Sequence, residues 1–402
     1  MKQVHERAYP IFFIARYSVI ILMLALPSRV AFGYELKVIP QVNVRTTFND
    51  NIFYDEDKVD MTSDFATVLS PAIRLTDRTE TFETSFMSRL VRTEYYDEKD
   101  LNATDQYHDG RMRWHYTEKI VISAEAGYSE DSQIDRDIET TGLVLGTPTR
   151  KRSHYGGDLD LVLTETSKAN ASYAYDRERF DDPEFDDSTS QDAAITLNHD
   201  LGPLFRETIG IIRASYAQYK YPYEDISNFS LVAGANRKLT EDLEVSAFLG
   251  RHMTRTSYDY SAFIRSRDWS RGTIGNVAVV YVGELTTSSL TFSSDIRSIS
   301  GEAGTVRRTS LRYNLARQFS YELKGDLSAE YYLNRQNREQ APGSDLDKET
   351  FRIQPAVIYV FSKDFSLEAS YRYTRLKDNE ANKSKPQNLY YLGFAWQHPI
   401  PR

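Results

Sequence analysis

The sequence predicts an all-β fold, a transmembrane antiparallel β-barrel of about 18 strands of the outer-membrane porin type. Three observations predict it: apolar and polar residues alternate in many runs, these runs are long, and short and long connections alternate between them. In the first run Val42 and Val44 alternate with Asn43 and Arg45, so one face of the strand is apolar and the other polar. Many runs reach the roughly 9 to 11 residues that a tilted strand needs to cross a bilayer.

The N-terminus has the features of an export signal. Basic residues precede an apolar core at 17–26, and the small residues Ala31 and Gly33 suit cleavage before Tyr34. The alternative, an uncleaved helical anchor, has an apolar stretch shorter than the roughly 20 residues that a spanning helix requires. We therefore expect residues 1–33 to be a signal peptide and 34–402 a single barrel in the outer membrane of a Gram-negative bacterium.

The alternating runs give the order of the strands. In the first half we expect strands at about 36–48, 61–75, 82–95, 107–116, 120–129, 154–164, 169–176, 190–199 and 207–220. In the second half we expect them at about 228–236, 243–252, 269–282, 288–298, 305–316, 321–334, 350–361, 365–375 and 387–397. An even count places both termini on the periplasmic side.

The connections support this count. Short ones, expected to be periplasmic, lie at 76–81, 117–119, 165–168, 200–206, 237–242, 283–287, 317–320 and 362–364. Long polar ones, expected to be extracellular and often acidic, lie at 49–60, 96–106, 130–153, 177–189, 253–268, 335–349 and 376–386. The links at 221–227 and 299–304 should also be extracellular although they are short, so the count depends most on them.

The composition agrees with such a barrel. Mean hydropathy is -0.54 and 27% of residues are charged, as expected if half of each strand faces water. No cysteine is present, which excludes disulfides and thiolate metal sites. The net charge of -9 argues against a nucleic-acid partner.

The polar face should line the lumen. The expected basic lining residues are Arg45, Arg74, Arg89, Arg113, Arg213, Arg297, Arg312, Arg352 and Arg372. The expected acidic ones are Asp64, Glu83, Glu125, Asp160, Glu244, Asp295, Asp326, Glu330 and Glu368. These charges could form a cross-strand ion-pair lattice that rigidifies the wall, or a series of donors and acceptors for a hydrated solute. We expect the lattice for most of them.

Two features should modify a plain barrel. The connection at 130–153, with apolar residues at 143–145, is long enough to fold into the lumen as a constriction, although it could equally lie over the rim. Pro40, Pro71 and Pro355 lie inside expected strands, where each removes a ladder donor. They predict bulges or misplaced strand ends.

No catalytic or metal-binding motif is present. The seven histidines form no H-E-x-x-H pattern, and there is no phosphate loop, dinucleotide fingerprint or G-x-S-x-G. We therefore expect no catalytic residue, no metal and no cofactor. The acidic clusters at 55–57 and 181–187 could bind calcium, but they lack EF-hand spacing, and solvated loops are the simpler interpretation.

The segment from Thr46 to Leu75 resembles a known family. Its features are the run at 49–52 and Ser63-Asp64-Phe65 leading into Leu69-Ser70-Pro71. They are similar to the opening of outer-membrane β-barrel porins that are often associated with exopolysaccharide or exosortase gene clusters. The resemblance implies a barrel through which, or beside which, a secreted polysaccharide leaves the cell. The C-terminus departs from the usual barrel ending, because six residues follow Trp396.

The resulting hypothesis is an outer-membrane pore for exopolysaccharide export. Expected partners are outer-membrane lipids and lipopolysaccharide, a polysaccharide or other hydrated solute, and periplasmic polysaccharide-export components. A general diffusion porin and a closed structural or glycan-binding surface barrel are the alternatives. An enzymatic role would require an activity that depends on a lumen residue such as His115.

Overall fold

The computed structural model describes residues 35–56, 61–132, 138, 148–202, 204–261, 264–301, 304–336 and 347–401. The expected signal peptide and the apolar residues at 143–145 lie outside these ranges. Among the described residues, no helix is both long and apolar enough to cross a membrane.

Eighteen long strands and one short one make up almost the whole described chain. They are β1 (Glu35–Asn49), β2 (Asp64–Arg78), β3 (Phe82–Tyr95), β4 (Ala103–Thr117), β5 (Ile120–Asp131), β6 (Arg150–Val162), β7 (Ser167–Phe180), β8 (Ser188–Asp200), β9 (Thr208–Lys220), β10 (Glu224–Lys238), β11 (Leu243–Ser261), β12 (Ile264–Val282), β13 (Thr286–Ser298), β14 (Thr305–Gln318), β15 (Leu323–Gln336), β16 (Asp347–Val360), β17 (Phe365–Asp378), β18 (Lys383–Gln397) and β19 (Ile400–Pro401). A 3-10 turn, η1 (Lys99–Leu101), lies between β3 and β4.

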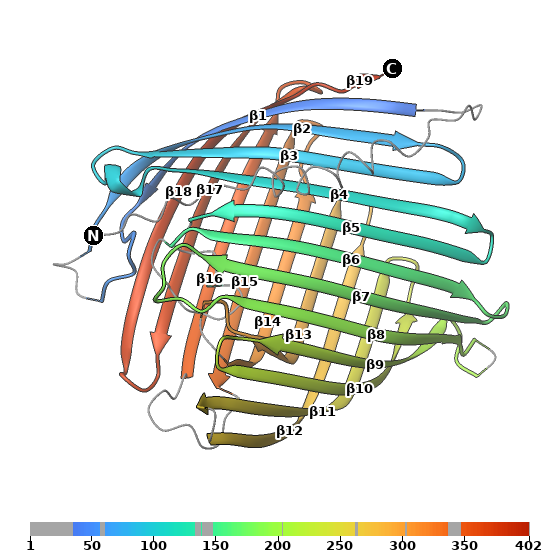
Figure 1. Ribbon diagram of the computed structural model, residues 1–402. Helices are drawn as coiled ribbons and strands as arrows, with labels where there is room; N and C mark the ends of the chain where they lie inside the picture. Colours follow the sequence, from blue (N-terminus) through green and yellow to red (C-terminus); the bar gives the residue numbers. More distant parts are fainter. Residues whose placement is uncertain are drawn as a thin grey trace, which may run out of the picture.

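The sheet closes on itself. Each long strand pairs antiparallel with the next, and β1 pairs with β18 from Gln41 opposite Gln397 to Asn49 opposite Leu389. In Figure 1 the blue to green strands form one wall, and the yellow to red strands form the wall behind it. The fold class expected from the sequence, an antiparallel barrel of about 18 strands, is confirmed.

The residues after Trp396 extend the closing seam. In β19, Ile400 lies opposite Val38 and Pro401 opposite Lys37, in the register that β18 already has with β1. The tail that departs from the usual barrel ending is therefore a continuation of the last strand.

The outer surface of the wall is apolar. Large side chains at alternate positions are exposed on this outward face, for example Leu231 at 50%, Leu392 at 57% and Ile195 at 60%. Their strand neighbours point to the opposite, inner face because side chains alternate along a strand. A contiguous apolar surface of this extent is typical of contact with lipid rather than water.

The three prolines sit inside intact strands, so the predicted bulges and misplaced ends are wrong at these positions. Pro40 lies opposite Ile73, Pro71 opposite Val42, and Pro355 opposite Leu327. Each proline interrupts pairing only toward its other neighbour strand, and the register there resumes unchanged. The reason is that each residue of an antiparallel ladder directs its N–H to one neighbour only.

The rim of the barrel has a step at β12. Pairing between β12 and β13 runs only from Gly275 opposite Ser294 to Val282 opposite Thr287. On the other side, β12 pairs with β11 up to Ile264 opposite Ser261. Among the described residues, the edge of β12 from Ile264 to Ile274 therefore has no strand partner on the β13 side.

Candidate functional site: the barrel interior

The interior has two distinct ends, which we name by their connections. The short-turn end carries the turns after β2, β4 and every second strand that follows, and it includes the start of β1 and the end of β18. The long-loop end carries the other connections. By the strand alternation, all eighteen lumen residues expected from the sequence belong to the inward face; their contact with a solute stays a prediction.

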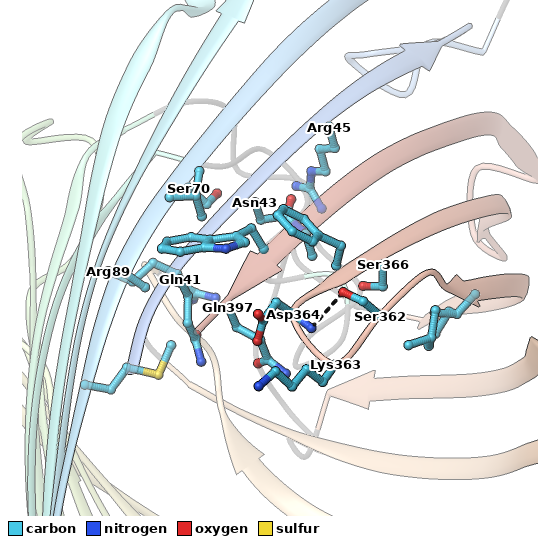
Figure 2. Close-up of a pocket in the computed structure, with 18 of the residues that line it drawn as sticks. Gln41, Asn43, Arg45, Ser70, Arg89, Ser362, Lys363, Asp364, Ser366 and Gln397 are labelled. Atoms are coloured by element: carbon cyan, nitrogen blue, oxygen red, sulfur yellow. Dashed lines mark hydrogen bonds between the residues drawn. The ribbon is translucent and has the colours of Figure 1, made fainter. Parts of the chain in front are cut away.

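A cavity of about 760 Å³ occupies the short-turn half of the interior. Figure 2 shows side chains from β1, β3 and the turn between β16 and β17 around it. Its polar lining includes Gln41, Asn43, Arg45, Arg89, Lys363 and Gln397. Arg45 and Arg89 are exposed to this space, and the guanidinium of Arg89 lies 4.7 Å from the centre of the Tyr107 ring.

A second cavity of about 430 Å³ continues toward the long-loop end. Arg45 lines both cavities, so the two spaces meet at this side chain. The guanidiniums of Arg45 and Arg372 lie 5.4 Å and 5.6 Å from the centre of the Tyr391 ring. Arginines stacked on tyrosine give a wall with both hydrogen-bond donors and flat apolar faces, which suits a hydroxylated solute.

One part of the wall carries an ion-pair chain across β4 to β7. His154 contacts Glu125 through Nε2 and Asp176 through Nδ1, both at 2.9 Å. Arg152 reaches Asp176 at 2.7 Å, and Arg111 reaches Glu125 at 3.6 Å. This chain has the form of the expected lattice, although only Glu125 belongs to the expected lining residues.

A second polar cluster lies on β14 and β15. Arg312 contacts Glu330 at 2.6 Å and donates a hydrogen bond of 3.0 Å to the Tyr332 hydroxyl. The guanidinium of Arg308 lies 3.9 Å from the centre of the same tyrosine ring. Here Arg312 and Glu330 bind each other across neighbouring strands, as a lattice requires.

Two expected lining residues, Arg352 and Asp64, line the second cavity although their side chains are almost fully buried. Arg352 is 4% exposed, and Asp64 is 3% exposed. The Asp64 carboxylate accepts hydrogen bonds from the backbone N–H groups of Asp97 and Glu98, each at 2.9 Å. Asp64 therefore holds the connection between β3 and β4 in place, and its position near a strand end makes it a loop anchor.

The opening of the barrel at the long-loop end, which we call the mouth, is crossed by the connection between β13 and β14. This connection is hydrogen-bonded to strands on another part of the wall, and we call such a crossing a bridge. The Ser300 hydroxyl donates to Glu178 Oε2 at 2.9 Å, and Arg150 Nη1 donates to Ser300 Oγ at 3.5 Å. The backbone N–H of Asp186 donates to the carbonyl of Gly301 at 3.0 Å. Since β6 and β7 lie far around the ring from β13 and β14, these bonds join distant parts of the wall.

Arg150 is the charged centre of this bridge. It contacts Asp131 at 3.3 Å and Glu178 at 3.6 Å, and its side chain is only 13% exposed. Two carboxylates and one guanidinium in a confined space depend on one another, because each loses water when it is buried.

Tyr221, in the turn between β9 and β10, also holds the connection between β13 and β14 in place. Its hydroxyl donates to the carbonyl of Ile299 at 2.8 Å. Burial raises the pKa of the Tyr221 phenol well above its usual value, so the hydroxyl stays protonated and remains a donor.

A second bridge comes from the connection between β5 and β6, for which the sequence left an inward fold and a position over the rim equally open. Ile138 is fully buried and packs with Tyr54 from the β1–β2 connection and Leu376 of β17. The Tyr54 hydroxyl donates to Gln387 Oε1 at 2.8 Å. The connection thus reaches across the mouth at Ile138; the apolar residues 143–145 lie outside the described chain.

Within the described ranges, no three His, Cys, Asp or Glu side chains are grouped as a metal site would need.

This protein is similar to known proteins only in its fold. No family model matches the sequence, and no curated protein is similar to it. Among solved structures, OccAB4 of Acinetobacter baumannii is 9% identical with a TM-score of 0.48, covering 93% of this chain and all of that one. OccK3 of Pseudomonas aeruginosa is 12% identical with a TM-score of 0.46, covering 90% and 96%. The unliganded ferric citrate transporter FecA is 7% identical with a TM-score of 0.49, covering 87% of this chain, and the chain spans 61% of its length.

Proposed function

We propose that this protein is an outer-membrane channel for a hydrated solute, and that the solute is an exopolysaccharide leaving the cell. The observation that carries the channel is the closed sheet, apolar on its outward face and lined inside by charged and tyrosyl side chains. Such a wall is stable only with lipid outside and water within. In this setting the short-turn end is periplasmic and the long-loop end extracellular.

The polysaccharide assignment is supported by the resemblance of the Thr46–Leu75 segment and by the chemistry of the lining. Arg45, Arg89 and Arg372 stack on Tyr107 and Tyr391 along one side of the interior. Sugar hydroxyls exchange bonds to water for bonds to such groups at modest net cost, and sugar rings pack on tyrosine faces. No chemical reaction enters the proposal.

The bridged mouth favours a second candidate, a surface barrel that holds a glycan without conducting it. In the channel proposal the bridges are the closed state, and they open when a solute or a periplasmic partner binds. In the second candidate they are permanent.

Reconstitution into planar bilayers and liposomes separates these candidates. For the channel we expect discrete conductance steps, together with uptake of neutral oligosaccharides by swelling liposomes. Oligosaccharides of increasing length then distinguish polysaccharide export from general diffusion, since a general porin excludes chains above a size limit. Detergent-purified protein that inserts but neither conducts nor transports sugar would overturn the channel proposal.

A further inference from the structure

Four arginines gather on the outward face of the β11–β12 hairpin. Arg251 and Arg255 lie on β11, and Arg267 and Arg271 lie on β12. All four are exposed. They share their face with Met253, opposite Arg271, and with Trp269, opposite Arg255. We name these four arginines with Trp269 the hairpin patch.

The hairpin patch has no acidic ion-pair partner within the part of the chain whose side chains are described. Among the described residues, none of its four arginines is joined to a carboxylate by an ion pair. Asp225 of β10 is the nearest acidic position on this face for which the side chain is described, and it lies opposite Ser257. Arg150 and Arg312, by contrast, face inward and contact carboxylates. Four uncompensated guanidiniums on one sheet surface create a local site for anions.

The height of the patch on the wall matches a lipid headgroup layer. Below it on β11, Leu243, Val245, Ala247 and Leu249 are the outward residues. From Leu243 to Arg251 the chain rises roughly 26 Å along the strand, or about 20 Å along the membrane normal at the usual tilt. The arginines therefore begin near the top of an apolar band of roughly 25 Å, on the extracellular side.

Trp269 and a neighbouring cleft add an apolar part to the site. Trp269 is 55% exposed, and tryptophan at this depth is typical of the membrane interface. A cleft of about 520 Å³ is lined by Met253, Trp269, Ser270 and Arg271. It lies along the part of β12 that has no strand partner on the β13 side. The cleft offers Met253 and Trp269 to an acyl chain or sugar ring beside the guanidinium of Arg271.

We propose that the hairpin patch binds the phosphate groups of a phosphorylated glycolipid in the outer leaflet. Guanidinium groups bind phosphate oxygens bidentately, and at the edge of the hydrocarbon they are less hydrated than in bulk water. The inference rests on the proposed membrane location and adds a specific lipid site to it. The ligand would hold the unpaired edge of β12 against the membrane.

The test titrates detergent-purified protein with diphosphorylated lipid A and reads the bound complex by native mass spectrometry. The Arg251→Gln/Arg271→Gln variant is expected to bind at least tenfold more weakly than the unmodified chain, and Arg251→Lys/Arg271→Lys is expected to retain part of the affinity. Arg237→Gln/Arg317→Gln is the matched control, because both arginines face outward at the periplasmic end of the wall. It should bind normally.

Two results would overturn the proposal: equal binding by the double glutamine variant, or equal binding of lipid A from which both phosphates have been removed. Folding of each variant is checked by its heat-dependent shift on gels. Membrane insertion of the unmodified protein is scored separately by flotation with liposomes. Failure of the unmodified protein to insert would reject the membrane location. Normal insertion without selective phosphate binding would reject only the lipid site at the hairpin patch.

Discussion

At the short-turn end, charged interior side chains such as Arg74, Glu83 and Glu368 are exposed, and the turns leave a cavity of about 760 Å³. At the long-loop end, interior polar side chains such as Thr350 and Asn334 are fully buried, and connections from distant strands are bonded to one another. The same strands supply both ends. The difference therefore comes from the connections, which are long enough at one end to cross the interior.

In the proposed channel, regulation can reside at the long-loop end. A wall of eighteen paired strands has no simple way to widen, because every added opening would break ladder bonds. The bridges at Ser300 and Ile138 depend on a few contacts, so a ligand can displace them at low cost. We expect substitutions at the long-loop end to change opening, and substitutions at the short-turn end to change only what passes.

The largest effect is expected for Arg150→Ala. The substitution leaves Asp131 and Glu178 close together without their shared cation. The bridge keeps these two carboxylates out of water, and removing the partner of a buried charge costs about 3 to 5 kcal/mol, so the bridged state should lose at least roughly a hundredfold in population. Single-channel recording would show this as a rise in open probability. Arg111→Ala is the control, since Arg111 pairs with Glu125 in an exposed position and its loss should leave opening unchanged.

A smaller effect is expected for Ser300→Ala. This variant loses the hydrogen bond to Glu178 and the one from Arg150. A bond to a charged group is worth about 1.5 to 3 kcal/mol, which predicts an increase in open probability of roughly tenfold or more. Ser366→Ala, at the cavity of the short-turn end, should leave the open probability unchanged. Identical open probabilities for Ser300→Ala and Ser366→Ala would show that Ser300 does not help to keep the mouth closed.

Arg45→Glu should change selectivity without changing opening. Arg45 lines both cavities, so an ion that crosses the barrel through these two cavities passes near it. Replacing a positive by a negative charge about 8 Å from the ion is worth about 1 kcal/mol in water before screening. We expect the cation-to-anion permeability ratio, measured from reversal potentials, to rise about twofold to fivefold. An unchanged ratio would show that ions take another path, and Arg237→Glu, on the outward face, is the control.

The smallest effect is expected for Gln41→Ala. Gln41 lines the cavity of the short-turn end and faces open space there. Stability to unfolding should stay within about 0.5 kcal/mol, as for an ordinary exposed position. Thermal unfolding in detergent measures this. A loss of several kcal/mol would mean that the short-turn end is packed as firmly as the other.

The alternating pattern predicts the wall well and its ends less well. Residues 82–95 form a strand with the bounds expected from the sequence, because apolar and polar residues alternate along most of that run. The β11–β12 hairpin instead continues to Ser261 and from Ile264, well past the expected ends near 252 and 269. Above the apolar band its outward residues are Arg255, Arg267 and Trp269, so the hydrophobic alternation stops while the backbone ladder continues.

The interior could be predicted only in part, for a similar reason. Alternation is enough to assign Arg45 and Glu330 to the inward face, because the side-chain period of a strand is fixed. It gives no information about Ser300 meeting Glu178, since that contact depends on the path of a connection across the mouth. Tyr221 and Arg150 were missed in the same way. The one available signal was the length of the connection at 130–153, which allowed either an inward fold or a position over the rim and gave no information about its partners.

The most direct test of the gated channel is a reversible cross-link. The chain contains no cysteine, so the Asp186→Cys/Gly301→Cys double variant introduces the only two thiols, at positions that form an antiparallel bridge between the two connections. Cα atoms paired in this way lie about 4.5 to 5.5 Å apart, within the range that a disulfide spans. Single-channel conductance is recorded under oxidising conditions and again after a reductant is added. We predict conductance that is absent or strongly reduced while the disulfide holds the mouth bridged, and that appears on reduction. Equal conductance in both states, with the cross-link verified by mass spectrometry, would contradict the account.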